Sequence, residues 1–239
     1  MKIAICGSNN ELRKDLVKTV MNNWPMYKTP AKTIEDDIEW PDDIKALDIT
    51  KEKLNDIEKQ LYSKLILISK QYNDYKDEKY MIYNGCSIDV MLMSIFLNEI
   101  DEVSDEFVEK MIYHNKSYLK NLDVVYWNPI KVKNFEDIKD EDERKLEMMY
   151  QNLYDNYYGH FEDSIYFDKK HTPGFIQIET DNPVDELKII LDNKGNFISD
   201  MNNDETLDMQ KMMNVLRNKT LIEGLMKGCK NYSIPIIGE

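Results

Sequence analysis

The first 25 residues constrain the fold more than any other part of the sequence. Residues 2–6 form a short apolar run that Gly7 closes, which is the pattern of a buried strand leading into a turn. Residues 10–23 follow with apolar side chains at helical spacing, and Pro25 stands just past their end. Three residues could cap this helix: Ser8, Asn9 and Asn10. The chain is therefore expected to open with a strand, a turn and a helix.

The same alternation continues along the chain. Three further short apolar runs predict strands, at residues 80–83, 123–127 and 175–179. Between and after them, amphipathic or apolar patterns predict helices at residues 51–72 with Thr50 as the cap, from residue 86 or 87 onward, and at 105–121, 142–158 and 183–191. Strands separated by helices of this length indicate parallel pairing with right-handed crossovers. We expect an α/β fold with three layers, in which helices cover both faces of a parallel sheet.

The pattern changes after residue 198. We expect residues 1–198 to form the α/β domain and residues 199–239 to form a C-terminal extension, with one Met-rich helix and a short apolar tail. Methionine side chains on such a helix pack against their own domain or adapt to a protein partner. The residues proposed for the second role are Met212, Met213, Ile236 and Ile237.

Charge and composition exclude several classes of function. The chain has 31 basic and 45 acidic residues, a net charge of -14, and a field of that sign repels nucleic-acid backbones and anionic lipids. We expect neither direct nucleic-acid binding nor membrane association, and no run approaches the roughly 20 apolar residues of a membrane span. The three cysteines and three histidines lack the spacing of a metal site. Reduced thiols in the cytoplasm, and no resident metal, are the expected state.

The opening turn has the layout of a phosphate-binding loop, but its residues differ from the functional pattern Gly-x-x-x-x-Gly-Lys-Ser/Thr. Gly7 is kept, whereas Leu12 replaces the second glycine, Arg13 the lysine and Lys14 the hydroxyl that binds magnesium. A leucine places a side chain where the backbone must approach phosphate, and Glu11 adds a like charge. Lys14 cannot coordinate Mg²⁺. These changes argue together against ordinary binding of ATP and magnesium.

The chain from residue 2 to about residue 198 resembles the P-loop nucleoside and nucleotide kinase-like proteins of tailed bacteriophages. The segments that carry the resemblance are residues 3–7, 27–30, 82–90, 122–129, 142–144 and 176–179. In that family the third segment reads Tyr-Asp-Arg-Ser/Cys-x-x-Asp, where the first acid and the arginine serve catalysis and phosphate contact. This chain has Asn84 and Gly85 at those positions and keeps Asp89, while Arg144 matches the lid arginine. The resemblance thus implies a kinase fold whose catalytic positions have changed.

Each candidate site residue has two interpretations. Arg13 and Lys14, with Gly7, could still bind an anion at the helix start, or the two long side chains could be solvated. Asp89 could be a surviving catalytic acid or an acid favoured in the first turn of its helix. Arg144 could close over a phosphate or form an exposed ion pair.

A stripe of tyrosines marks the helix at residues 142–158. Its members lie three or four residues apart and include Tyr150, Tyr154 and Tyr157. Such a stripe is typical of packing or of a protein interface. Together with the C-terminal segment, we expect it to bind a protein partner or a second copy of the chain.

Three functions remain open on this evidence. The leading hypothesis is an inactive, pseudo-kinase protein that serves as a structural or interaction subunit, as a component of a phage virion or its assembly, in the host cytoplasm. The alternative is a divergent nucleoside or nucleotide kinase that uses ATP and Mg²⁺, with Asp89 and Arg144 as catalytic residues. A third class is a sensor that binds a small molecule or anion without turnover.

Overall fold

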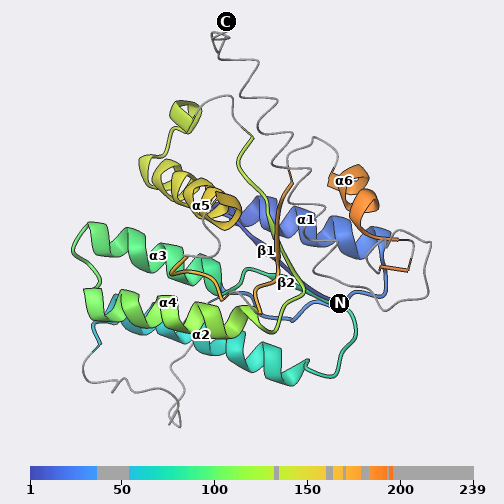
Figure 1. Cartoon of the computed structure of the whole chain (residues 1–239), viewed down its shortest axis with the longest axis horizontal. Helices are drawn as coiled ribbons and strands as arrows, with labels where there is room; N and C mark the ends of the chain where they lie inside the picture. Colours follow the sequence, from blue (N-terminus) through green and yellow to red (C-terminus); the bar gives the residue numbers. More distant parts are fainter. Residues whose placement is uncertain are drawn as a thin grey trace, which may run out of the picture. The chain divides into compact units, whose positions relative to one another are not determined.

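A computed structural model of the chain describes residues 1–36, 54–131, 135–159, 164–168, 171–178, 183–192 and 194–195 (Figure 1). The predicted boundary at residue 198 and the whole extension at 199–239 lie outside these residues. The predictions of a C-terminal helical extension, and of Met212, Met213, Ile236 and Ile237 as partner residues, therefore stay predictions.

The described chain alternates strands and helices, as the sequence pattern predicts. The strands are β1 (Lys2–Cys6), β2 (Met81–Asn84), β3 (Val124–Trp127) and β4 (Gly174–Gln177). The helices are α1 (Asn10–Asn23), α2 (Asp56–Asp74), α3 (Ser87–Glu99), α4 (Asp105–Leu119), α5 (Glu141–Gly159) and α6 (Pro183–Ile190), with a short 3-10 helix, η2 (Phe135–Asp137), before α5. Within the described residues, none of the helices combines the length and apolar character needed to cross a membrane.

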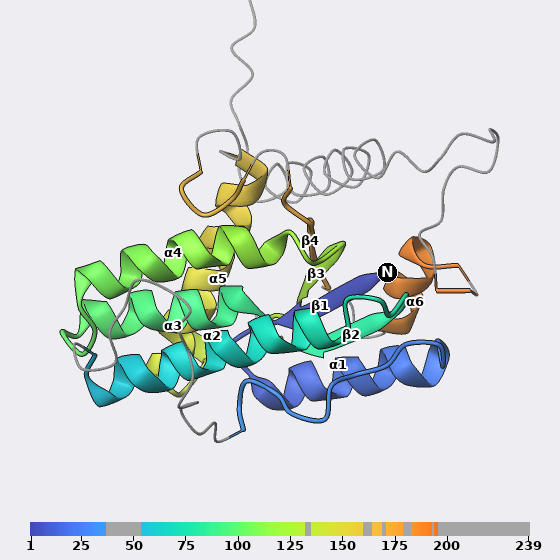
Figure 2. The same ribbon diagram turned by 90° about the horizontal axis from the view of Figure 1, so that it is seen from below.

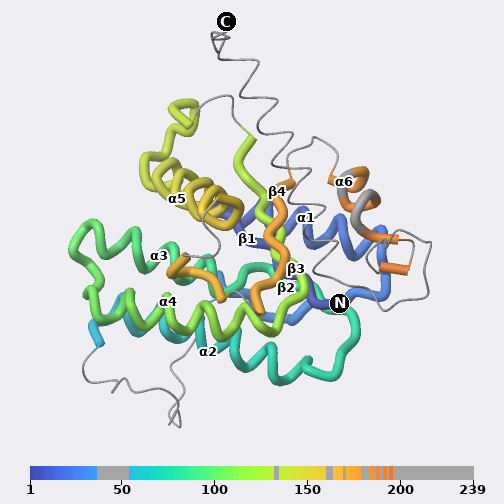
Figure 3. The backbone as a smooth tube through the Cα atoms, viewed as in Figure 1, coloured from blue at the N-terminus to red at the C-terminus, as the bar shows by residue number. Residues whose placement is uncertain are grey.

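The four strands form one parallel sheet in the order β2-β1-β3-β4. The chain leaves β1 toward β2 on one side, then crosses back over β1 to reach β3 on the other, as the trace in Figure 3 shows. Loops that leave the carboxyl ends of neighbouring strands in opposite directions create a crevice, which is where α/β sheets bind ligands. The predicted class, α/β with a parallel sheet, is confirmed.

Helices cover both faces of the sheet, so the domain has three layers. Ala4 and Cys6 of β1 belong to one buried cluster with residues of α2, α3, α4 and α5. Ile3 and Ile5, which alternate with them, are also fully buried and face the opposite side, where α1 contacts β1 and β2 and α6 contacts α1. In Figure 2, α2, α3 and α4 run side by side as a separate layer.

The start of α2 differs from the prediction. Thr50 lies outside the described residues, and the helix begins at Asp56 with Asn55 as its cap. Asn55 accepts the amide of Glu58 at 2.8 Å, and the Glu58 carboxylate accepts the amide of Asn55 at 3.0 Å, which forms a capping box. The other carboxylate oxygen of Glu58 accepts from the amide and hydroxyl of Ser104, at 3.0 and 2.6 Å, ahead of α4. The Asn-x-x-Glu pattern of residues 55–58 therefore sets the start of this helix.

Gly85 permits the turn between β2 and α3. Its φ of +91° lies in the region that favours glycine, and a Cβ there would lie 2.4 Å from the Cδ1 atom of Ile34. The buried Ile34 side chain packs directly onto this backbone. A side chain at this position, where the resemblance places an arginine, would require Ile34 to move and the backbone to be strained.

Replacing Gly85 with alanine should lower the free energy of unfolding by about 1–3 kcal/mol, because the new methyl group meets Ile34 and the backbone is strained. Urea denaturation of the purified protein measures this. Gly159→Ala is the matched control, since no atom lies within 4 Å of the Cβ it would add, and we expect no loss there. Equal losses for the two variants would contradict this account of Gly85.

Candidate functional site

The turn after β1 is short, because α1 already begins at Asn10. Gly7 has a φ of +149°, and a Cβ at this residue would lie 2.9 Å from the carbonyl oxygen of Asn128. This close approach of two backbones accounts for the glycine. Gly7, Ser8 and Asn9 therefore make the whole turn, and the residues aligned with the second half of a phosphate-binding loop are helical.

Oxygen atoms of the chain itself accept the amides of this segment. The Asn9 side chain accepts from the amides of Glu11 and Leu12, each at 3.1 Å, and the Asn9 carbonyl accepts the amide of Arg13 at 3.2 Å. The amide of Gly7 donates to the Asp89 carboxylate at 3.1 Å. A phosphate-binding loop works by offering such amides to the ligand. Here the amides of Gly7, Glu11, Leu12 and Arg13 are already hydrogen bonded to oxygen atoms of the chain.

Arg13 lies inside the protein, with only 2% of its surface exposed. Its guanidinium donates to the carbonyl of Gly7, to the carboxylate of Glu35 and, at 3.3 Å, to the side-chain oxygen of Asn84. The Asp89 carboxylate lies 4.0 Å away. Burial alone would lower the pKa of Arg13, but the negative charges around it, led by Asp89, outweigh burial and raise it. Arg13 is thus a buried cation held by groups at the ends of several elements.

Asp89 stands in the first turn of α3 and is almost completely buried. One carboxylate oxygen accepts the amide of Gly7 and, at 2.5 Å, the hydroxyl of Tyr150, and the other accepts the amide of Cys86 at 2.7 Å. Burial raises the pKa of Asp89 above its usual range, while Arg13 and these hydrogen bonds oppose the shift. Asp89 caps α3, as an acid in the first turn of a helix is expected to do, and it also lies in the candidate site. A catalytic role for Asp89 stays a prediction.

Two glutamates attach α5 to the turn. Glu147, only 1% exposed, accepts the hydroxyl of Ser8 at 2.5 Å and the amide of Ile130 at 3.0 Å. Glu143, one helical turn earlier, accepts the side-chain amide of Asn9 at 2.9 Å. Burial raises the pKa of Glu147, and the bonds from Ser8 and Ile130 partly oppose this. Sequence reasoning missed both glutamates, although their spacing of four residues places them on one helix face.

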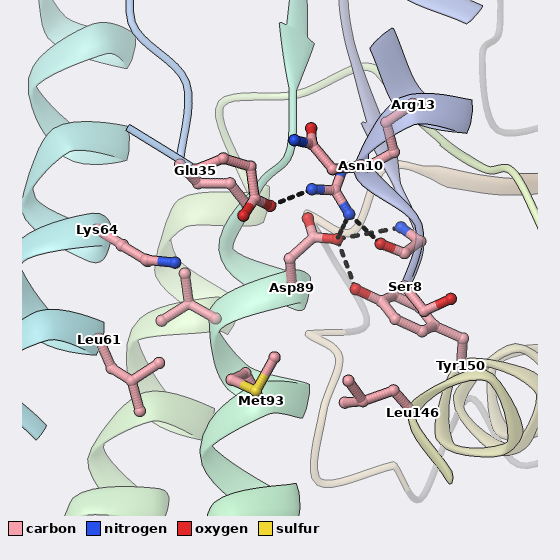
Figure 4. Close-up of a pocket in the computed structure, with 13 residues that line it drawn as sticks. Ser8, Asn10, Arg13, Glu35, Leu61, Lys64, Asp89, Met93, Leu146 and Tyr150 are labelled. Atoms are coloured by element: carbon pink, nitrogen blue, oxygen red, sulfur yellow. Dashed lines mark hydrogen bonds and ion pairs between the residues drawn. The ribbon is translucent and has the colours of Figure 1, made fainter. Parts of the chain in front are cut away.

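A cavity of about 120 Å³ lies beside Arg13 and its charged partners Glu35 and Asp89. Figure 4 shows Arg13, Glu35, Asp89 and Tyr150 at its polar end and Leu61, Met93 and Leu146 at its apolar end, while Lys64 reaches toward it from α2. The remaining lining residues are Gly7, Ser8, Asn10, Ile34 and Val90. The cavity lies at the carboxyl end of β1, where the sheet topology favours ligand binding.

The sequence candidates divide into two groups. Gly7, Arg13 and Asp89 come together at this cavity. Lys14 does not, since its partly exposed side chain pairs with Glu11 at 2.8 Å on the surface of α1. Arg144 is partly buried on α5 and is not among the residues that line the cavity. Among the described residues, no group of three His, Cys, Asp or Glu side chains is arranged to hold a metal ion.

The tyrosines of α5 face the interior, which corrects their prediction as a partner surface. Tyr150, Tyr154 and Tyr157 are 3%, 5% and 2% exposed and belong to the hydrophobic core. Tyr150 and Tyr154 pack against the Trp127 ring, with centroids 6.3 and 5.4 Å away. Spacing alone identifies a common helix face, but the sheet covers that face here. The packing interpretation of the stripe is therefore the correct one.

Comparison with known proteins identifies the fold. No protein-family model matches the chain, and no curated protein sequence matches it. A structure of deoxyadenosine kinase from M. mycoides, with products dCMP and a flexible dCDP bound, is 16% identical and covers 93% of this chain and 100% of its own, with a TM-score of 0.50. The same kinase with bound dATP is 15% identical over 92% of this chain and 100% of its own, with a TM-score of 0.44. The first likeness shows a P-loop nucleoside-kinase-like fold.

Removing the Tyr150 hydroxyl should destabilise the folded protein, because this hydroxyl donates to Asp89. Tyr150→Phe deletes a hydrogen bond to a buried carboxylate, so we expect the free energy of unfolding to fall by about 1.5–3 kcal/mol. Tyr126→Phe is the control, because that hydroxyl is equally buried and has no hydrogen-bond partner within the described part of the chain. Urea denaturation should show little or no loss for the control. Similar values for both variants would contradict the role given to Tyr150.

Glu147 should make stability depend on pH. Its raised pKa means that the folded state holds the proton more tightly than the unfolded chain. The stability it contributes is thus fully present below its ordinary pKa and is lost as pH rises through the raised value. A glutamine at this position cannot ionise and can still accept the amide of Ile130. As pH rises from acidic to neutral, Glu147→Gln should therefore become more stable relative to the unsubstituted protein.

Urea denaturation of both proteins across that pH range measures the difference. Asp89 is present in both proteins, so its own titration cancels in the comparison. A difference that stays constant with pH would show that Glu147 does not titrate in the folded protein as expected.

Proposed function

We propose that this chain keeps the fold of a nucleoside kinase without transferring phosphate from ATP, and that it acts as a structural or interaction subunit. The observation that carries the proposal is the hydrogen bonding in and just after the turn that follows β1. The amides of Gly7, Glu11 and Leu12 and the Arg13 guanidinium are groups that would contact phosphate. They already donate to Asp89, Asn9, Glu35 and the Gly7 carbonyl.

Electrostatics at the turn supports the same proposal. Glu35 and Asp89 line the cavity beside Arg13 and Lys64, and Glu147 binds the Ser8 hydroxyl, so carboxylates offset the positive charge where phosphate groups would lie. Like charges oppose the approach of a triphosphate. Lys14, at the position of the magnesium-binding hydroxyl, is paired with Glu11. Kinases obtain nearly all of their rate from preorganised phosphate and metal contacts, so this arrangement gives little catalysis.

An assembly role accounts for a fold that is kept while its chemistry is lost. The resemblance to proteins of tailed bacteriophages makes a virion, or the machinery that assembles it in the host cytoplasm, the expected setting. The partner is a protein or a second copy of this chain, bound through the C-terminal segment with Met212, Met213, Ile236 and Ile237. Since the tyrosines of α5 are buried, they take no part in this proposed surface. The net charge of -14 argues against nucleic acid as the partner.

The second candidate is a divergent nucleoside or nucleotide kinase. The observation in its favour is the cavity with Arg13 and Asp89 at the carboxyl end of β1, in a fold like that of a deoxyadenosine kinase. Under this alternative the protein binds ATP and Mg²⁺, Arg13 takes the lysine's role, and Asp89 and Arg144 act in catalysis. Arg13 would first have to exchange Glu35 for the phosphate.

Incubation with Mg-ATP and a panel of deoxynucleosides and deoxynucleotides distinguishes the two. We expect no labelled phosphate to move from ATP to any acceptor. Transfer that Arg13→Ala abolishes, and that the matched surface variant Glu11→Gln retains, would overturn the proposal. Circular dichroism of the Arg13→Ala protein shows whether lost activity reflects the contact or an unfolded chain.

Thermal unfolding with and without millimolar ATP is the second measurement. We expect no rise in the midpoint, since a ligand stabilises a protein only when it binds the folded state. A rise accompanied by phosphate transfer would support the kinase alternative. A rise without transfer would support a nucleotide sensor instead, and would contradict a purely structural role.

A further inference from the structure

The Arg13–Glu35 ion pair has one buried and one exposed member. The Arg13 side chain is 3% exposed, whereas that of Glu35 is 36% exposed. The guanidinium is anchored from inside by the carbonyl of Gly7 and by Asn84, and Glu35 approaches it from the cavity (Figure 4). Glu35 is therefore the partner that can be removed without opening the core.

The charges around the cavity balance only when Glu35 is counted. Among the lining residues, Arg13 and Lys64 are basic and Glu35 and Asp89 are acidic, which gives two charges of each sign. Asp89 is held by three hydrogen bonds at the inner end. Lys64, on α2, forms no ion pair within the described ranges of the chain. Neutralising Glu35 would leave one excess positive charge and two cations facing the same cavity.

We propose that Arg13 and Lys64 form a latent oxyanion site, and that the Glu35 carboxylate keeps it closed by pairing with Arg13. A carboxylate and a phosphate offer the guanidinium the same pair of acceptor oxygens. Glu35 competes at high effective concentration because the chain holds it beside Arg13. When Glu35 is neutralised, a small tetrahedral oxyanion of the inorganic phosphate class takes its place. This deepens the proposed function and rests on it, because it identifies the contact that keeps the site closed.

Glu35→Gln tests the site directly, with inorganic phosphate as the probe and the full chain as the protein. Isothermal titration calorimetry should show that phosphate binds the variant about tenfold or more tightly than the unsubstituted protein, since one competing charge-assisted contact is gone. Glutamine can still accept a guanidinium N–H, so Glu35→Ala is titrated as well. If neither variant binds phosphate more tightly than the unsubstituted protein, the proposal is wrong.

Two controls locate the binding. Glu11→Gln also removes one negative charge, but on the surface of α1, where it releases Lys14, and it should not gain affinity for phosphate. Lys64→Met, added to Glu35→Gln, should lose most of the gain. An equal gain in Glu11→Gln, or a gain that Lys64→Met leaves unchanged, would place the anion elsewhere and overturn the proposal.

The two proposals fail separately. Phosphate transfer from ATP by the unsubstituted protein would end the proposal of an inactive kinase fold, whatever the Glu35 variants do. Absence of transfer, combined with no gain of phosphate affinity in either Glu35 variant, would leave that proposal standing and end only the inference about Glu35.

Discussion

The buried positive charge of Arg13 is the constraint on which the centre of this protein depends. A guanidinium that is almost completely removed from water is tolerated only when it is paired and hydrogen bonded. Its partners are Gly7 after β1, Asn84 at the end of β2, Asp89 at the start of α3, and Glu35 from the segment before α2. One side chain on α1 therefore fixes how two strands and two other segments meet. Loss of any one partner would leave the remaining groups with an imperfectly compensated charge.

The contacts that stabilise this region are also the ones that change its chemistry. Amides after a first strand can bind a ligand only if the protein leaves them free. In this chain Asn9 of the turn itself, Asp89 of α3 and Glu147 of α5 accept hydrogen bonds from groups in or just after the turn. These groups consequently have their hydrogen-bond partners within the chain. The donors that a phosphate-binding loop would offer to its ligand make hydrogen bonds within the chain in the described geometry.

Local sequence patterns predict the elements well and the site only in part. The strands and most helix ends lie within two residues of the predicted ones, because apolar runs, caps and Pro183 act over short distances. Gly7, Arg13 and Asp89 are brought together, as parallel strands with adjacent carboxyl ends require. Glu35 could not be found, since no local pattern says which of 45 acidic residues meets Arg13. The periodicity of the α5 tyrosines defines a helix face but not what covers it, so it cannot distinguish a partner surface from the buried face that they form.

The position of β1 in the sheet has a consequence for how the chain is made. Of the four strands of this sheet, β1 is synthesised first and is a central one. Lys2 of β1 pairs in register with Met81, and Ile3 with Val124, so its partners come about 79 and 121 residues later. Until they are synthesised, β1 is a short apolar segment with both edges open. Parallel pairings between such distant residues form slowly, because closing a long loop costs entropy before any stabilising contact forms. During this interval the nascent chain exposes an apolar strand that has no partner, which is the condition under which unfinished chains aggregate.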